Sequence, residues 1–564
     1  MIPLEKHWQI QPRITPEADK NLAGYPPFLR QVLFNRGFGT AEESNLFLAA
    51  KPIDPIHNQK IKGLSAAVDR LAYAIAHGES IVVYGDYDCD GVTATALLCQ
   101  SILALGGHAQ AYIPDRFEEG YGLNINALRQ LKEEGAKVVV SVDCGIRSLK
   151  EAEEARNLVL DLIITDHHTP GPELPDALAI INTKQDGDEY PEKQLAGVGT
   201  AFKLASALEK KLRPGEDLSA RFLDLVALGT VADMVPLTGE NRWMVREGLT
   251  QIHQPKRQGL FSLISVSGLK AANVRSGDIG FMLGPRLNAA GRLETAKRAL
   301  LLLMTDSVFE AGKLAQDLDN QNRERQELTV SMTESAEGIV TAAGGDPLLL
   351  FALNPEYNTG VVGLVASRLT EKFYRPSIVG QQGEQTTRAS CRSIPEFHIT
   401  QALESCAELF ENFGGHAAAA GFTVRNERLS EVMDRLNAYA QEKLSGLTLR
   451  PTLVADAELP LVDLKPDLLN QIELIEPTGY GNPQVNLVSR GLQVRDSRAV
   501  GQDGRHLKLV VTDGWITYDA IAFRHGDWAQ AMPKMVDLLY RFEANEFNGR
   551  RTMQLNVRDL KASA

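Results

Sequence analysis

The chain has 564 residues and a mass of 61.8 kDa, so at roughly 150 residues per domain we expect three to four domains. Hydrophobic residues make up 44% and charged residues 23% of the sequence, which excludes a disordered or fibrous protein. The net charge of −13 argues against a protein that coats nucleic acid through bulk positive charge. The last 74 residues differ, because they hold 11 Lys and Arg against 9 Asp and Glu, which is compatible with a local basic surface.

Cysteine usage and hydropathy indicate a compartment. The five cysteines are odd in number and include no CxxC pair, which fits neither a disulfide framework nor a zinc ribbon and favours a reducing environment. The N-terminal segment lacks the apolar core of a signal peptide, and no run of 18 apolar residues occurs in the sequence. We therefore expect a cytoplasmic protein that does not enter a membrane.

The N-terminal half predicts an arm followed by an α/β domain. Residues 1–45 show no sustained periodicity and are interpreted as an arm that packs on a larger body. Over residues 46–245, helical patterns alternate with fully apolar runs, which predicts a parallel sheet covered by helices. The expected strands are 81–84, 137–142 and 158–164, and the expected helices are 64–76, 93–105, 127–134, 197–212 and 218–231.

The C-terminal half predicts three further segments. Residues 246–345 are interpreted as a helical connector with a long helix at 297–342. Residues 346–445 form a smaller α/β segment that a strand at 348–353 opens. Short alternating runs over 446–564 indicate an antiparallel barrel or sandwich.

The strongest chemical signal follows the first strand. The segment YGDYDCDG places the carboxylates Asp86, Asp88 and Asp90 at alternate positions in the turn before a helix. The carboxyl ends of parallel strands form the ligand crevice of such a sheet, where unpaired acids would repel one another and a divalent cation would relieve the repulsion. The alternative is a solvated acidic turn in which Asp90 caps the helix.

The next two strands and a later helix end in the same kinds of residue. Asp143 follows the second strand, Asp166-His167-His168 follows the third, and Asp233 lies in the segment VADMVP. An oxygen-rich set with imidazole and no thiolate suits Mn²⁺ or Mg²⁺, and two such ions can clamp the attacking and leaving oxygens of a phosphoester. No GxxxxGK[ST] segment is present, which argues against a nucleotide-binding P-loop. A purely structural role for the histidine pair is the alternative.

These motifs resemble a known superfamily. GDYDCDG, VDCGI, TDHH and VADMVP are similar, in order, to the motifs of the DHH phosphoesterases. Within that superfamily, IPDRFEEGYGLN, GPRLNAAGRL and GGHAAAAGF resemble the RecJ family of bacterial single-strand-specific exonucleases over about residues 50–564. The resemblance implies a multidomain α/β protein in which a parallel-sheet DHH domain is joined by a long helix to a smaller α/β DHH-associated domain, followed by an OB-fold barrel.

The same resemblance implies an activity and its metal ligands. The activity is 5′ to 3′ degradation of single-stranded DNA to 5′-mononucleotides, in recombinational, mismatch and base-excision repair. By motif, Asp88 would hold one ion, Asp143 would bridge two ions, and His168 would face the scissile phosphate; the ligands of the second ion would be Asp90, His167 and Asp233. Asp86 would be either a ligand or an orienter of water. Tyr84 stands where many members have a metal-binding histidine, so the first metal would be bound more weakly here.

The resemblance also implies contacts to DNA. Arg116 and Arg286 occupy positions of phosphate contacts, although either could pair with local acids instead. The residues expected to hold the 5′ end in the DHH-associated domain are Arg388, Ser390, Arg392, Gly414, Gly415 and His416. The two glycines could instead end a helix. Aromatic residues of the tail could stack on bases or form the barrel core, and the candidates are Trp515, Tyr518, Phe523, Tyr540 and Phe547.

The implied partners are single-stranded DNA, single-stranded-DNA-binding protein, and recombination and repair helicases, with the chain acting as a monomer. Two other functions remain open at this point. One is a phosphodiesterase for cyclic dinucleotides or short oligonucleotides, against which the extra C-terminal domain argues. The other is a non-catalytic scaffold of the same fold, against which the complete set of motif acids argues.

Overall fold

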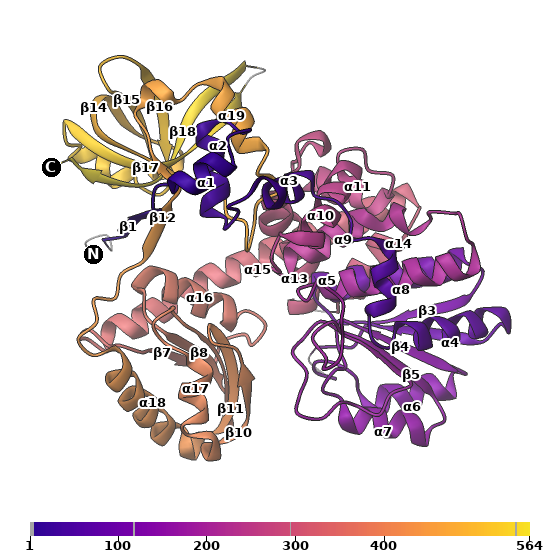
Figure 1. Ribbon diagram of the computed structural model, residues 1–564. Coiled ribbons are helices and arrows are strands. Elements are labelled where there is room, and N and C mark those ends of the chain that lie inside the picture. The colour runs from indigo at the N-terminus through magenta and orange to yellow at the C-terminus, as the bar shows by residue number, and fades with distance from the viewer. Residues whose placement is uncertain (1–4, 117–118, 294, 548–549, 564) are drawn as a thin grey trace. The chain divides into compact units, whose positions relative to one another are not determined.

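The computed structural model describes residues 5–116, 119–293, 295–547 and 550–563 (Figure 1). The chain divides into two compact units, and each is described by itself. One comprises residues 8–318 and 454–564, and the other comprises residues 319–453 with the first seven residues. Among the described helices, none is both long and apolar enough to span a membrane.

A parallel sheet forms the centre of the larger unit, as the apolar runs predicted, but β3 (His108–Tyr112) and β6 (Ala179–Ile181) extend the three expected strands to five. The strand order is β3-β2-β4-β5-β6, and the other strands are β2 (Ser80–Tyr84), β4 (Val138–Val142) and β5 (Asp161–Thr165). One face packs against α4 (Leu64–Ala76), α5 (Cys89–Ala104) and α8 (Gly197–Leu212). The other face packs against α6 (Ile125–Glu133) and α7 (Leu149–Asn157). Every residue of β4 is buried, because helices cover both faces.

Further helices extend the same core. Leu263, Leu287 and Leu302 pack in one cluster with the sheet residues. The helices concerned are α9 (Leu223–Ala232), α10 (Gly239–Ile252), α11 (Gln258–Val266), α13 (Gly284–Leu293) and α14 (Lys297–Met304). Because α10 runs through residue 245 and the core continues beyond it, we propose that this domain extends to the end of α14.

The helical pattern at 297–342 forms two helices rather than one. Thr305 is extended after α14, and Ser307 accepts a hydrogen bond from the Glu310 N–H at the start of α15 (Val308–Ala342). This side-chain cap begins a new helix where the pattern alone showed no break. The first turns of α15 add Ala311 and Leu318 to the core around the parallel sheet.

The smaller unit holds a mixed five-stranded sheet in the order β10-β11-β9-β8-β7. Its strands are β7 (Leu350–Asn354), β8 (Ser377–Gln382), β9 (Thr386–Arg392), β10 (Phe410–Gly415) and β11 (Ala419–Arg425). Only β7 and β8 pair in parallel. One face packs on α15 and α16 (Val362–Phe373), and the other on α17 (Ile399–Glu404) and α18 (Leu429–Leu444).

The C-terminal strands close into a barrel, which decides between the barrel and the sandwich. The order β14-β15-β16-β18-β17 is closed by pairing of β17 with β14. The strands are β14 (Leu487–Val500), β15 (His506–Thr512), β16 (Thr517–Ala522), β17 (Met535–Phe547) and β18 (Arg550–Ala562). The pairing of β16 with β18 is parallel, because the chain passes through β17 between them, so the barrel is not purely antiparallel.

The N-terminal arm is helical and packs on the barrel. It contains α1 (Pro16–Asn21), α2 (Pro27–Asn35) and α3 (Ala41–Ala49), each too short to show a sustained period in the sequence. Leu33 and Phe47 belong to one buried cluster with barrel residues such as Leu538 and Tyr540.

Candidate metal centre

Two of the carboxylates are held by helix N-termini. Asp88 caps α5, and its side chain accepts hydrogen bonds from the N–H groups of Asp90 (2.9 Å) and Gly91 (3.0 Å). The cap is therefore Asp88 and not Asp90. Asp90 is buried and accepts hydrogen bonds from the N–H groups of Gly197 (2.7 Å) and Val198 (2.9 Å), the first residues of α8. The helix N-terminus thus orients this carboxylate.

The structure brings all the predicted metal-site residues to one edge of the sheet. Three groups each offer ligand atoms within 4.8 Å of one another: Asp86, Asp88 and Asp143; Asp90, His167 and Asp233; and Asp143, His167 and His168. Asp143 and His167 each belong to two groups. The Nε2 atom of His167 lies 3.2 Å from Asp143 Oδ1 and 3.5 Å from Asp233 Oδ2.

Several atoms of these groups lack the hydrogen bonds that buried polar atoms normally make. Asp86 Oδ1, Asp143 Oδ1 and His167 Nε2 are buried and make no well-aligned hydrogen bond, although the last two atoms lie 3.2 Å apart. Such atoms are rare in folded proteins unless a water or an ion satisfies them. Carboxylate oxygens with an imidazole nitrogen form a donor set that fits Mn²⁺ or Mg²⁺. The residues present therefore fit divalent metal.

The electrostatics favour the same conclusion. Burial and the neighbouring Asp88 raise the pKa of Asp90 to about 7. Burial and Asp90 raise the pKa of Asp233 to about 9, and the same causes raise the pKa of Asp143 well above its ordinary value. Burial and the neighbouring His168 lower the pKa of His167 to about 3, so this imidazole is neutral and keeps a lone pair for a metal. The buried carboxylates therefore repel one another, and a bound cation would relieve this repulsion.

Divalent metal should stabilise the protein more at about pH 8 than at about pH 6.5. Because the pKa values of Asp90 and Asp233 are raised, the metal-free folded protein retains protons that the unfolded chain has released. Its stability therefore falls as the pH rises through this range, whereas bound metal replaces the protons. We expect the increase in Tm on adding Mn²⁺, measured by scanning fluorimetry against an EDTA control, to grow with pH. Equal increases at both pH values would contradict this.

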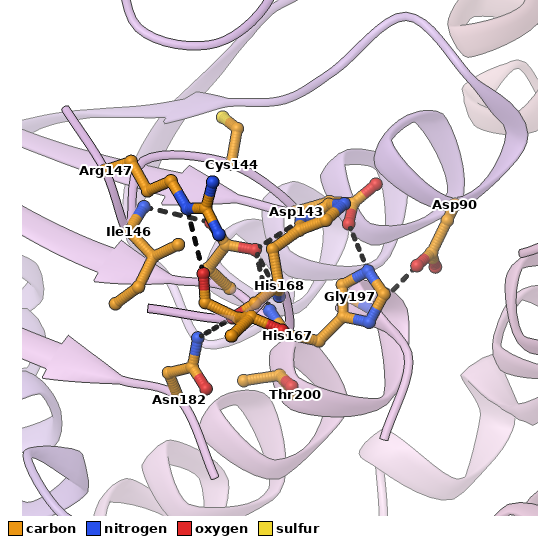
Figure 2. A network of polar contacts seen from close by, with 12 residues as sticks. Asp90, Asp143, Cys144, Ile146, Arg147, His167, His168, Asn182, Gly197 and Thr200 are labelled. Carbon is orange, nitrogen blue, oxygen red and sulfur yellow. Dashed lines mark hydrogen bonds and ion pairs between the residues drawn. The ribbon is translucent and has the colours of Figure 1, made fainter. Parts of the chain in front are cut away.

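Figure 2 shows His167 and His168 beside Asp143. Asp166 organises this histidine pair. Its Oδ1 atom accepts hydrogen bonds from the N–H groups of His167 (2.7 Å) and His168 (3.0 Å) and lies 2.8 Å from His168 Nδ1, while Oδ2 accepts one from Ile146 N–H (2.9 Å). Burial opposes ionisation of Asp166, but the hydrogen bonds and charge of His168 outweigh it and hold the pKa of this carboxyl below its ordinary value. We propose that Asp166 positions His168 and does not bind metal itself.

Sequence reasoning missed further neighbours of the site. The Asn182 side chain donates a hydrogen bond to the His168 carbonyl (2.8 Å), and the Tyr121 hydroxyl donates one to the Asp143 carbonyl (3.2 Å). Asn182 directly follows β6, so its place at the carboxyl end of a parallel strand was an available signal. Tyr121 lies in a loop and gave no comparable signal.

Gly197→Ala should inactivate the site without changing its charge. A Cβ atom at Gly197 would lie 2.5 Å from Asp143 Oδ1, so the carboxylate or the helix would have to move. A misplacement of this kind is expected to slow metal-dependent cleavage by about 100-fold. Gly199→Ala is the matched control, because its Cβ would meet only side-chain atoms, at 3.4 Å or more. Similar cleavage rates for the two variants would contradict the expectation.

Tyr84 packs in the core of the sheet and not beside the candidate metal ligands. It is fully buried on the α6 side of the sheet, and its hydroxyl donates a hydrogen bond to the Gly122 carbonyl (3.1 Å). Its place in the fold is structural, so it contributes no ligand for the first metal. Asp86, in contrast, lies within reach of Asp88 and Asp143 as a possible ligand.

The two arginines predicted to contact phosphate lie in the larger unit. The Arg116 guanidinium lies over the Tyr87 ring, 5.0 Å from its centroid, next to the Asp88 turn. Arg286 lies on α13 and donates a hydrogen bond to the Met282 carbonyl (2.7 Å).

The predicted 5′-end residues of the smaller unit share neighbouring strands. Arg388, Ser390 and Arg392 alternate along β9 and therefore project from one face of the sheet, opposite the buried Ala389 and Cys391. Gly414 and Ser390 both pair with Gly421 of the strand between them. Gly414 and Gly415 end β10, so the alternative that they terminate a helix is wrong. Gly415 has a φ of 149°, and a Cβ there would lie 2.4 Å from the Ala419 carbonyl oxygen.

The aromatic residues of the barrel divide into two sets. Tyr518 and Tyr540 are buried in its core. Trp515 is 90% exposed and Phe523 is 51% exposed, so these two are available to a ligand. The side chain of Phe547 lies outside the described residues.

Comparison with known proteins decides the family. Three segments match known families: residues 80–230 the DHH family N-terminal domain, 345–443 the DHHA1 domain, and 455–559 the RecJ OB domain. The single-stranded-DNA-specific exonuclease RecJ of Bacillus subtilis is 38% identical, covering 100% of this chain and 72% of that protein. The chain belongs to the RecJ family. The RecJ of Escherichia coli is 36% identical, covering 98% of this chain and 99% of that protein.

Solved RecJ structures share the fold. The crystal structure of RecJ from Thermus thermophilus in complex with Mn²⁺ matches with a TM-score of 0.85 at 30% identity, covering 99% of this chain and 80% of that chain. The same protein in complex with Mg²⁺ matches with a TM-score of 0.79 at 28% identity, covering 99% of this chain and 79% of that chain. The predicted RecJ resemblance and fold class are therefore confirmed.

Proposed function

We propose that this protein is a metal-dependent exonuclease that degrades single-stranded DNA from the 5′ end to 5′-mononucleotides. The observation that carries the proposal is the set of three neighbouring ligand groups, linked through Asp143 and His167, which contain buried atoms that make no hydrogen bond. RecJ relatives along the full chain are named single-stranded-DNA-specific exonucleases, and one was crystallised with Mn²⁺ and with Mg²⁺. The cofactor is accordingly Mn²⁺ or Mg²⁺.

The site residues take the following roles in this proposal. Asp86 and Asp88 would hold one ion, and Asp90, His167 and Asp233 would hold the second. Asp143, which shares one group with Asp86 and Asp88 and another with His167, would serve both. When bound, two such ions stabilise the charge that develops on the attacking and leaving oxygens of a phosphodiester. Burial lowers the pKa of His168, but the hydrogen bond and charge of Asp166 outweigh it and raise this pKa above its ordinary value. In the protonated ring Nδ1–H faces Asp166, and Nε2–H remains to donate a hydrogen bond to a phosphate oxygen.

Cationic and small residues hold the DNA. Arg116 and Arg286 bind backbone phosphates near the metal centre, where a guanidinium matches phosphate oxygens in bidentate geometry. The 5′-terminal phosphate is held by residues of the smaller unit on β9, at the end of β10 and just after it, namely Arg388, Ser390, Arg392, Gly414, Gly415 and His416. The common face of the three β9 residues and the exposed backbone of the two glycines support this assignment.

End-labelled substrates test the activity and its polarity. Single strands labelled at either end are incubated with Mn²⁺, with Mg²⁺ and with EDTA, beside blunt duplex and a cyclic dinucleotide. We expect immediate release of labelled mononucleotide from the 5′-labelled single strand only, and none with EDTA. Immediate release from the 3′ label would reverse the polarity, and cleavage of the cyclic dinucleotide alone would make the protein a phosphodiesterase.

Other proteins would supply this enzyme with single-stranded DNA in the cell. An exonuclease for single strands in recombinational, mismatch and base-excision repair needs strands that helicases unwind and that single-stranded-DNA-binding protein covers. We propose that the chain works with both as a monomer in the cytoplasm, where bacterial DNA lies. Sedimentation of the chain with and without single-stranded-DNA-binding protein tests the monomer and the complex.

A further inference from the structure

A buried polar network connects α10 with α8, the helix whose first N–H groups bind Asp90. Residues 190–196 lead directly into α8, whose first N–H groups bind Asp90. Tyr190 is fully buried, and its hydroxyl donates a hydrogen bond to Glu240 Oε2 (2.6 Å). The Asn241 side chain donates one to the Gln194 carbonyl (2.6 Å). The first residues of α10 therefore hold this loop at two points.

Glu240 also binds the helix that the loop enters. Its other carboxylate oxygen forms an ion pair with the Lys203 ammonium group on α8, and Lys203 and Glu240 are 5% and 1% exposed. The Lys203 nitrogen lies 5.2 Å from the centre of the Tyr190 ring. Glu240 thus connects the start of the loop with the body of α8, on either side of Gly197 and Val198.

Burying an ion pair costs desolvation free energy and is weak evidence for a gain in stability. The Lys203–Glu240 pair is not part of the candidate metal groups, but with Tyr190 it links α8 to the loop that precedes it. The orientation of Asp90 depends on where α8 starts, because each of its carboxylate oxygens accepts a hydrogen bond from an N–H group in the first turn of α8. A small shift of the helix start would change both bonds together.

We propose that Glu240, with Lys203 and Tyr190, is a positioning network that sets the orientation of Asp90 and thereby the metal affinity of the Asp90, His167 and Asp233 group. The inference rests on the proposed metal-dependent function. Residues that orient metal ligands typically change metal affinity by about 10- to 100-fold when they are replaced. A network that served only stability would leave the metal affinity unchanged.

The test compares two isosteric substitutions of buried acids. Glu240→Gln removes the charge of the network, whereas Asp456→Asn removes the charge of a comparably buried pair with Arg36 (2.8 Å), between the arm and the barrel. Mn²⁺ binding to the full chain is measured without DNA by electron paramagnetic resonance, beside Tm. We expect both variants to lower Tm, but only Glu240→Gln to weaken Mn²⁺ binding, by about tenfold.

Further variants keep the outcomes distinct. If Glu240→Gln does not fold, Tyr190→Phe, which removes a single hydroxyl, and Lys203→Met replace it, and weaker Mn²⁺ binding in either supports the network. Unaltered Mn²⁺ binding in the folded network variants, while Asp143→Asn reduces it, would overturn the positioning role. Equal Mn²⁺ binding by Asp143→Asn and the unaltered chain would instead overturn the proposed metal centre.

Discussion

Replacing Asp143 by Asn is expected to abolish cleavage of single-stranded DNA while leaving DNA binding intact. Asp143 is the carboxylate common to two ligand groups, and its Oδ1 atom has no hydrogen-bond partner in the folded protein. Loss of a bridging ligand removes several kcal/mol of transition-state stabilisation, which corresponds to a rate decrease of about a thousandfold or more. Asn is preferred to Ala here, because Asp143 has a φ of 60°, which Asn tolerates.

The measurement pairs a cleavage assay with equilibrium DNA binding. DNA affinity should not fall, because the substitution removes a negative charge and no phosphate-binding cation. A variant that still cleaves in a metal-dependent manner would remove Asp143 from the site. A variant that loses DNA binding to the same extent as cleavage would show that Asp143 supports the fold of the binding surface instead.

Arg242→Met is expected to lower the stability of the folded chain strongly, and far more than the same substitution at Arg246. Arg242 lies on α10, is 1% exposed, and donates hydrogen bonds to the backbone carbonyls of five residues: Phe47, Leu474, Ile475, Glu476 and Pro477. The guanidinium also lies 4.1 Å from the centre of the Phe47 ring. Burial lowers its pKa to about 10, so it remains charged at neutral pH. Arg242 therefore connects α10 of the parallel-sheet domain with α3 of the arm and with the segment before β14.

Removing this donor takes a hydrogen bond from all five carbonyls, although those of Ile475 and Pro477 keep one from the Asn482 side chain (2.8 Å each). We expect a decrease of about 3–5 kcal/mol in the free energy of unfolding. Urea denaturation measures the loss, and limited proteolysis shows whether the chain opens before β14. Arg246→Met is the matched control, since Arg246 lies one turn further along α10, is exposed, and contacts the Leu48 and Ala49 carbonyls. Equal losses for both variants would mean that Arg242 does not join the domains.

The candidate metal ligands could be predicted because each one lies next to a recognisable strand or helix end. Asp88, Asp143 and His167 follow apolar runs, and the carboxyl ends of parallel strands necessarily meet at one edge of a sheet. The choice between barrel and sandwich could not be made in this way, because alternating runs do not show which two strands pair to close the sheet. The closing contact between β14 and β17 joins segments far apart in the chain.

By itself, then, the sequence determined the order of domains, the parallel sheet and the set of acids and histidines at its edge, because local periodicity and chain direction dictate these. Only the tertiary structure decided that Asp88 caps α5, that Asp166 orients His168, and that Gly197 must lack a side chain. The same holds for the contacts of Glu240 and Arg242 with distant segments. Hydrophobic periodicity encodes which side chains are buried, but the partner of a buried polar group depends on which remote segment packs opposite it.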